Sequence, residues 1–288
     1  MDSLVAARFI SYTLLLAVAG LPFYAAIRKR SRFDARARIV LAILALGALV
    51  SSIGWAFANV AAMADMPLAA LDTETFTMVL RATPLGTVLS VRTALLVLFC
   101  LALVLRPSPV LLSALALPGL ATAAWAGHAG AGEGTAGLVL RACDVVHLMG
   151  ASLWLGALLS FVTRLLGRSQ TAAALDDLAG FARMGSMVVL ALLFTGTLNA
   201  WLIADPVNVP PNDLLSAPWL RLIGVKIVLF FAMLGFAAMN RWYLVPAVVT
   251  NGPSELKALK TSVILETVCA IAVVAAVSVA GQLPPIGP

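Results

Sequence analysis

Apolar runs of roughly 20 residues recur along the whole chain, separated by short segments that hold most of the charge. A run of that length spans the roughly 30 Å hydrocarbon layer of a bilayer at a helical rise of 1.5 Å per residue. Inside lipid, every backbone N–H and C=O must be paired within its own segment, so these runs must be helices. With 62% hydrophobic and 11% charged residues, the chain cannot cover the surface of a soluble domain. The sequence therefore predicts an all-α polytopic membrane protein.

About eight such runs divide the chain, and no linker between them is long enough to form a second domain. We expect a single transmembrane bundle over residues 1–288. The seventh run is too long to stand upright, so it should tilt or extend into the cytoplasm. The expected spans are Leu4–Ile27, Ile39–Ala64, Pro84–Leu105, Val110–Gly127, Leu138–Leu165, Met184–Ala204, Trp219–Val248 and Thr261–Gly281.

The orientation follows from the loops. The first, third, fifth and seventh loops hold most of the 19 Lys and Arg residues, whereas acidic residues dominate the opposite loops. Basic residues resist translocation, so both termini are expected on the periplasmic side. The net charge of +6 reflects these loops, and we expect no nucleic-acid partner. The first span has no basic stretch before it and no cleavage site, which predicts a retained span and not a removed signal peptide.

Ionisable residues within the expected spans need an explanation, because each costs at least ~2.5 kcal/mol to insert. Interhelical ion pairs, such as Asp144 with Arg141 or Arg92, would explain them by packing alone. Glu266 lies in the inner half, where it should face the bundle interior near a hydrogen-bonding group or be protonated, and Asn240 has a comparable depth. The residues concerned are Arg92, Arg141, Asp144, His147, Lys226 and Glu266.

The fifth span carries the densest set of chemically useful side chains. Cys143 and His147 are four residues apart and Asp144 and His147 are three apart, so all three share one helix face. Thiolate and imidazole suit copper or zinc, and Asp144 would orient the second imidazole nitrogen. The alternative is that His147 is a buried, neutral, hydrogen-bonding residue and that the cysteines, all within expected spans, are structural.

The expected outer loops add further soft or borderline ligands. Met63 and Met66 end the second span, Met78 follows in the next loop, and His128 opens the loop after the fourth span. Thioether sulfur prefers Cu(I), and imidazole accepts copper in either oxidation state. His128 and His147 are the only two histidines, and a copper site joining them across the outer half of the bundle is one interpretation. The other is that the glycines around His128 form a tight re-entrant turn.

Short motifs spread over nearly the whole chain resemble one family. They are Arg8-Phe9 and Gly20-Leu21-Pro22-Phe23, Thr83-Pro84-Leu85-Gly86 before Arg92, Gly127-His128-Ala129, His147…Trp154-Leu155-Gly156, Gly224-Val225-Lys226…Asn240-Arg241…Pro246, and the ending from Glu266 to Pro285. On these motifs the sequence resembles the copper resistance protein D (CopD/PcoD) family of bacterial inner-membrane proteins. The family often has two glycines after the tryptophan, whereas here Gly156 is followed by Ala157, a mild departure.

The resemblance implies copper handling at the bacterial inner membrane, with Cu(I) or Cu(II) moved from periplasm to cytoplasm. The chain contains no ATP-binding loop, so we expect transport without ATP hydrolysis. It would be passive, driven by the membrane potential, or coupled to protons through groups such as Asp144 or Glu266. We expect a transporter and not an enzyme. A periplasmic copper carrier is the expected partner, in addition to membrane lipids.

Two other functions fit the same residues. A b-type haem or redox membrane protein would use His128 and His147 as axial ligands. A non-transporting protein would accept copper from the periplasmic carrier and pass it on or sense it. A Soret band would identify the first, and binding without accumulation in sealed vesicles the second.

Overall fold

The computed structural model describes residues 2–126, 134–167, 171–204 and 217–284, and every regular element in them is helical. Short 3₁₀ turns cover Leu68–Ala70, Thr122–Trp125 and Gly252–Glu255, and the turn Asn240–Leu244 is π-helical. The α-helices are α1 (Asp2–Ile27), α2 (Ala35–Met63), α3 (Thr73–Ala82), α4 (Pro84–Leu105), α5 (Pro109–Ala121), α7 (Gly134–Leu166), α8 (Thr171–Ala204), α10 (Pro218–Met239), α11 (Val245–Asn251) and α12 (Leu256–Ala280).

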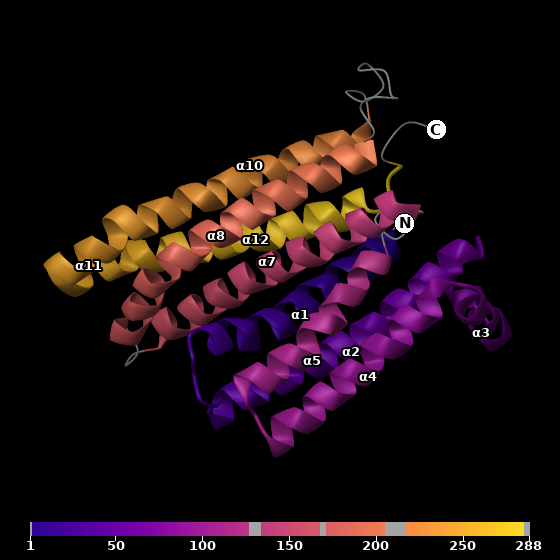
Figure 1. Cartoon of the computed structure of the whole chain (residues 1–288), viewed down its shortest axis with the longest axis horizontal. Helices are drawn as coiled ribbons and strands as arrows, with labels where there is room; N and C mark the ends of the chain where they lie inside the picture. The colour runs from indigo at the N-terminus through magenta and orange to yellow at the C-terminus, as the bar shows by residue number, and fades with distance from the viewer. Residues whose placement is uncertain (1, 127–133, 168–170, 205–216, 285–288) are drawn as a thin grey trace.

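Seven helical stretches among the described residues are long and apolar enough to cross a membrane, and Pro109–Trp125 forms a shorter apolar helix. Arg8, near the start of α1, donates a 2.9 Å hydrogen bond from Nη1 to the carbonyl oxygen of Gly281, which follows α12. The two ends of the chain therefore meet at one end of the bundle (Figure 1). This arrangement agrees with an even number of crossings, in which the shorter helix Pro109–Trp125 would serve as the expected fourth span. The predicted all-α polytopic membrane fold is confirmed.

Two expected spans are parts of longer helices. We expect the sixth span at Met184–Ala204, but α8 begins at Thr171, because the helix also includes a polar segment with Asp176 and Asp177 that precedes the apolar stretch Arg183–Ala204. The seventh span runs without a break from Pro218 to Asn251, through α10, the π-helical turn and α11. Its length agrees with the expectation that this segment is longer than an upright span.

One helix was not expected. The polar stretch before the third span folds into α3, whose N-terminus is capped because Asp72 Oδ1 accepts a 2.7 Å hydrogen bond from the Thr75 backbone N–H. α3 packs against α2 and α4, where the rings of Phe57 and Phe76 stack with centroids 4.1 Å apart. Amphipathic helices of this length need no long apolar run, so hydropathy does not reveal them.

The core is continuous between the two halves of the chain. α7 packs against α1, α8 and α12, and α1 packs in turn against α2 and α5 (Figure 1). α1 and α7 approach backbone to backbone where Gly20 faces Gly156, as expected for membrane helices that pack through small residues. One cluster of buried apolar side chains extends from α1 to α12. The bundle positions the polar residues described below on the faces of α7 and its neighbours.

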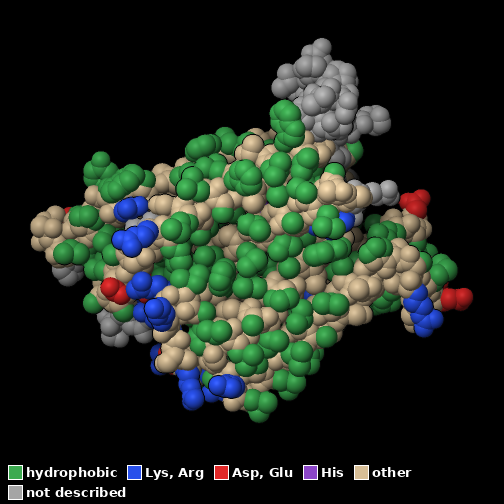
Figure 2. Space-filling view, in the orientation of Figure 1, with side chains coloured by type: hydrophobic (Ala, Val, Ile, Leu, Met, Phe, Trp, Pro, Cys, Tyr) green, Lys and Arg blue, Asp and Glu red, His purple; other side chains and the backbone are tan. Residues whose placement is uncertain are grey.

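The outer surface separates by polarity along the bundle. Figure 2 shows hydrophobic side chains over the middle of one face, with Lys and Arg gathered at the end that holds the α1–α2 connection and the start of α8. This distribution matches the loop asymmetry seen in the sequence. The assignment of this basic end to the cytoplasm stays a prediction from the positive-inside rule.

Candidate functional site

His147 on α7 is held by the neighbouring helix α8. Its Nδ1 lies 2.9 Å from Thr195 Oγ1, and Thr195 donates its single hydroxyl proton to the Ala191 carbonyl oxygen at 2.6 Å. Thr195 can therefore only accept from the imidazole, so the proton is assigned to Nδ1 and the lone pair to Nε2. Because Thr195 accepts from Nδ1, the lone pair of Nε2 is the one that a metal ion could bind, and the Leu192 backbone adds a further hydrogen bond to the imidazole.

The packing of α8 makes room for the imidazole. A Cβ atom on Gly196 would come within 3.2 Å of His147 Cε1, so a larger residue would press on the ring. A Cβ atom on Gly150 would come equally close to Leu192 Cδ2. Glycines on both helices therefore let α7 and α8 approach closely at the depth of His147.

Asp144 is the second polar group on this face, one turn from His147. Asn199 Nδ2 donates a 3.3 Å hydrogen bond to Asp144 Oδ1, and Lys226 on α10 and Arg8 on α1 are the cations whose charges act on this carboxyl group. The expectation that Asp144 orients the imidazole is wrong, because Thr195 occupies Nδ1. Thr195 and Asn199 were missed by sequence reasoning, although two polar residues four apart in an apolar span are a signal for such a face.

The suggested ion pair between Arg92 and Asp144 is also wrong. Arg92 on α4 is 0% exposed, its Nε donates to Thr122 Oγ1 at 2.9 Å, and its guanidinium lies 5.1 Å from the centroid of the Trp55 ring. A cation over an aromatic face is stabilised by the ring quadrupole. Arg92 therefore belongs to the α2–α4–α5 side of the bundle and not to the polar face of α7 and α8.

The structure tests the expected copper ligands only in part. No three His, Cys, Asp or Glu side chains gather at metal-binding distances in the ranges that the structure describes, and Cys143 is a half-buried free thiol. His128 lies outside the described residues, so its pairing with His147 stays a prediction. Met63 and Met78 are 60% and 61% exposed.

The outer methionines form a group separate from His147. Met63 ends α2, Met66 follows it, and Met78 is on α3, which packs against α2 and α4. His147 faces α8, on the other side of α7 (Figure 1). The two sets of candidate ligands cannot act as one site, and at most they are successive stations.

Glu266 on α12 is buried and accepts two hydrogen bonds. Trp154 Nε1 donates to Oε1 at 3.1 Å, and Asn240 Nδ2 donates to Oε2 at 3.1 Å. The expected proximity of Asn240 and Glu266 is confirmed, and their role in transport stays a prediction. The sequence indicates Trp154 only as part of a motif, yet it lies 7 residues after His147 on the same helix, so α7 carries a residue of each polar group.

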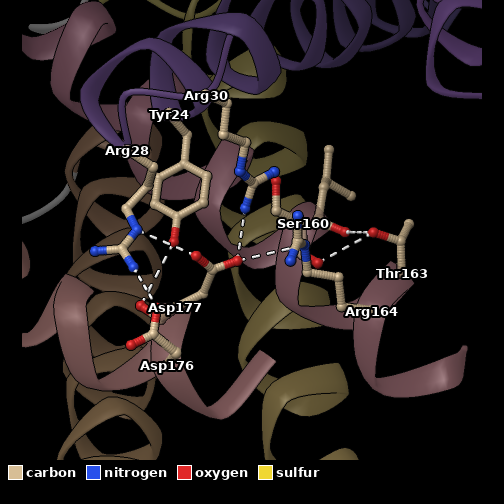
Figure 3. Close-up of polar contacts among 9 residues, drawn as sticks. Tyr24, Arg28, Arg30, Ser160, Thr163, Arg164, Asp176 and Asp177 are labelled. Carbon is tan, nitrogen blue, oxygen red and sulfur yellow. Dashed lines mark hydrogen bonds and ion pairs between the residues drawn. The ribbon is translucent and has the colours of Figure 1, made fainter. Parts of the chain in front are cut away.

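A cluster of charges at the basic end of the bundle was not anticipated. Asp177, near the start of α8, is 4% exposed and forms ion pairs with Arg28 at 3.1 Å, Arg30 at 2.6 Å and Arg164 at 3.3 Å (Figure 3). Asp176, which is largely exposed, pairs with Arg28 at 2.9 Å. The polarity of this segment predicts a loop. The structure instead shows that the start of α8 is helical and that ion pairs join it to the end of α1 and to α7.

Comparison with known proteins gives two family matches, one before and one after most of α7 in the sequence. Residues 1–138 match the family described as copper resistance protein D-like, N-terminal domain, and residues 175–280 match copper resistance protein D. Most of α7 (Gly134–Leu166) lies between these two stretches. The case for His147 and Trp154 therefore rests on geometry and not on the family match.

Two curated relatives carry related names. Copper resistance protein D of Pseudomonas syringae pv. tomato is 30% identical over 223 residues, which cover 72% of this chain and 71% of the relative. Inner membrane protein YebZ of Escherichia coli K12 is 32% identical over 143 residues, about half of each chain. No solved structure matches the chain. With its apolar helices it is a multi-pass inner-membrane protein, and by these matches the chain belongs to the copper resistance protein D family.

Proposed function

We propose that the protein moves copper from the periplasm to the cytoplasm without ATP hydrolysis, as a transporter and not an enzyme. The observation that carries this proposal is the arrangement of His147, whose Nδ1 is held by Thr195 while Nε2 keeps its lone pair inside the outer half of the bundle. Placing a polar imidazole inside a membrane costs free energy, and such residues usually belong to functional sites. A hydrogen bond that orients the ring is typical of histidines that bind metals. The copper resistance relative supports copper as the metal.

The exposed methionines fit the first step of such a path. Met63 and Met78 lie at the end of the bundle that is expected to face the periplasm, where a copper carrier would deliver its cargo. Thioethers bind Cu(I) and release it readily to imidazole or thiolate groups. His147, with Cys143 four residues earlier on the same helix, would receive it, and His128 would contribute from the loop before α7.

The inner half offers a group for proton coupling. Glu266 lies on α12 beside Trp154 of α7, and a carboxyl group at this depth can carry a proton in exchange for a metal charge. The electrical gradient provides a further driving force of about 2.3 kcal/mol per charge for each 100 mV. Either source would replace ATP.

Copper uptake into sealed proteoliposomes tests the proposal. With an inside-negative potential, the parent protein should accumulate copper, and His147→Ala should lose most of that uptake and of the copper bound. Thr195→Val should weaken copper affinity about tenfold, because it removes the contact that orients the imidazole. Cys143→Ser should reduce uptake, whereas Cys100→Ser, a cysteine on α4, serves as the matched control.

Other outcomes would reject the proposal in distinct ways. Copper binding without accumulation would identify a protein that only accepts copper from a carrier. A Soret band in the purified protein would favour the haem alternative, to which the names of the relatives lend no support. Uptake by His147→Ala at the parental rate would place the metal path elsewhere, first of all at the outer methionines.

A further inference from the structure

An apolar cavity of about 680 Å³ lies in the inner half of the bundle between α7, α8, α12 and the π-helical turn after α10. Its volume is in the range of sites for small organic ligands. One wall is aromatic, with Phe181 packed edge to face against Trp154 and against Phe161, both at 5.7 Å between ring centroids. Leu190 and Trp242 line its outer edge and are 67% and 64% exposed on the apolar surface, so the mouth opens toward lipid.

Asn240 lines this cavity and carries a buried, unpaired acceptor beside it. The side chain is 3% exposed, and its Oδ1 has no hydrogen-bond partner in the part of the chain that the structure describes. Both oxygens of Glu266 are already used, one by Trp154 and the other by Asn240 Nδ2. A buried acceptor without a donor is costly, and π-helical turns such as the one that begins at Asn240 are frequent at functional sites.

We propose that this cavity binds a membrane-soluble quinol, a flat aromatic ring that carries hydroxyl groups and an apolar tail. One hydroxyl would donate to Asn240 Oδ1 once a small shift of this side chain exposes the buried oxygen to the cavity. The ring would pack against Trp154 and Phe181, and the tail would leave past Leu190 and Trp242 into the bilayer. The ligand reaches the site through lipid, because the mouth opens on the lipid-facing surface. The inference does not depend on copper transport.

A phospholipid is the competing occupant. Arg241 lies at the mouth and would suit a phosphate group, but a headgroup held there leaves Asn240 Oδ1 without a donor. If the phosphate went deeper, it would bring negative charge toward the Glu266 carboxyl group. A quinol would supply a donor for Asn240 Oδ1, a ring that packs on the aromatic wall, and an apolar tail that fits the lipid-facing mouth.

The first test is binding to the full-length protein in phosphatidylcholine nanodiscs, under argon and without copper. A short-tailed benzoquinol and the corresponding quinone are titrated, and quenching of tryptophan fluorescence is followed. The parent should bind the quinol saturably and more tightly than the quinone, because only the quinol offers an O–H to Asn240 Oδ1. Ala238→Phe fills the cavity and should weaken binding at least tenfold, whereas Ala232→Phe, exposed on the same helix, should leave it unchanged.

A second variant reverses the preference. In Glu266→Gln, the amide has one oxygen, which can accept from Trp154 Nε1, and one NH₂ group, which would face the Asn240 NH₂ group. The Asn240 amide must therefore rotate by about 180°, so that its Oδ1 accepts from the new glutamine. The cavity then faces an N–H donor in place of an acceptor, so the variant should bind the quinone more tightly than the quinol.

Three results would overturn the inference. They are the absence of saturable binding to the parent, equal binding to Ala238→Phe, and an unchanged preference in Glu266→Gln. Native mass spectrometry adds a fourth, because a phospholipid that is retained by the parent, lost in Ala238→Phe and not displaced by quinol would assign the cavity to lipid. Since copper is absent throughout, none of these results depends on whether the protein transports it.

Discussion

Replacing Gly20 by alanine should separate α1 from α7 and destabilise the bundle. A Cβ atom on Gly20 would lie far inside 3.0 Å from the carbonyl oxygen of Ser152 and at 3.0 Å from the Gly156 backbone nitrogen. These neighbours are backbone atoms of a helix and cannot turn aside as a side chain can. The two helices must therefore move apart by about 1 Å at this point.

The cost can be worked from that displacement. A gap of about 0.5–1 Å forfeits a quarter to a half of the dispersion energy of the atoms concerned. Overpacked sites of this kind typically lose about 1–3 kcal/mol. Because the clash is with backbone atoms, the upper part of that range applies, about 2–3 kcal/mol. Alanine also favours a helix over glycine by about 0.5–1 kcal/mol, so the net loss for Gly20→Ala should be about 1–2.5 kcal/mol.

The assay is thermal unfolding of the detergent-solubilised protein, with Gly54→Ala as the control. Gly54 is in the interior of α2, and a Cβ atom there would meet nothing within 4 Å. It should therefore show the helix-propensity gain alone and melt at or above the parental temperature. Gly156→Ala approaches the Gly20 backbone from the other side and should behave like Gly20→Ala. If Gly20→Ala and Gly54→Ala melt together, the backbone contact between α1 and α7 is not present in the membrane protein.

Three further expectations can be checked separately. Asp177→Asn removes the charge shared by three arginines and should lower the free energy of unfolding by about 3–5 kcal/mol. The side chain of Asp176 is 81% exposed, so Asp176→Asn should lower it by at most about 1 kcal/mol. Equal effects would mean that the buried ion pairs stabilise the fold no more than the exposed one. Glu266→Gln should keep the fold but slow copper uptake and flatten its pH dependence, and an unchanged pH profile would reduce Glu266 to a packing residue. Cysteines placed at Arg30 and Asp213 should be labelled from the periplasm only at 213, and the reverse pattern would overturn the predicted orientation.

The fold could be predicted from the sequence wherever lipid dictates the structure. Runs that cross the hydrocarbon layer must be apolar and helical, so the span at Pro84–Leu105 was predicted with the bounds that the structure gives it. Helices that lie outside lipid are not under that constraint. For this reason α3 and the first turns of α8 were missed. The π-helical turn at Asn240 leaves no mark in periodicity, because it adds only one residue to a turn.

The candidate site could be predicted only along single helices. The spacing of Asp144 and His147 places them on one face of α7, but their partners Thr195 and Asn199 come from α8. The register between two helices depends on side-chain packing and cannot be read from either helix alone. Charge complementarity predicts a carboxylate partner for Arg92. Its partners are instead the hydroxyl group of Thr122 and the aromatic ring of Trp55.

The two sides of α7 differ in a way that bears on transport. Half of the residues in the apolar stretches of α1 and α7 are buried, against 11% in α8 and 6% in the stretch that contains α10. On the α1 side, Gly20 and Gly156 bring the backbones into contact and leave no room for sliding. On the α8 side, the contacts to α7 include the side-chain hydrogen bonds of His147 to Thr195 and of Asp144 to Asn199, which can break and re-form more easily than a backbone contact can move. A path from His147 to the region of Trp154 and Glu266 would therefore open by movement of α8 against a fixed α1–α7 pair. Asp177, which ties the start of α8 to Arg28 and Arg164, would set the pivot of that movement at the basic end.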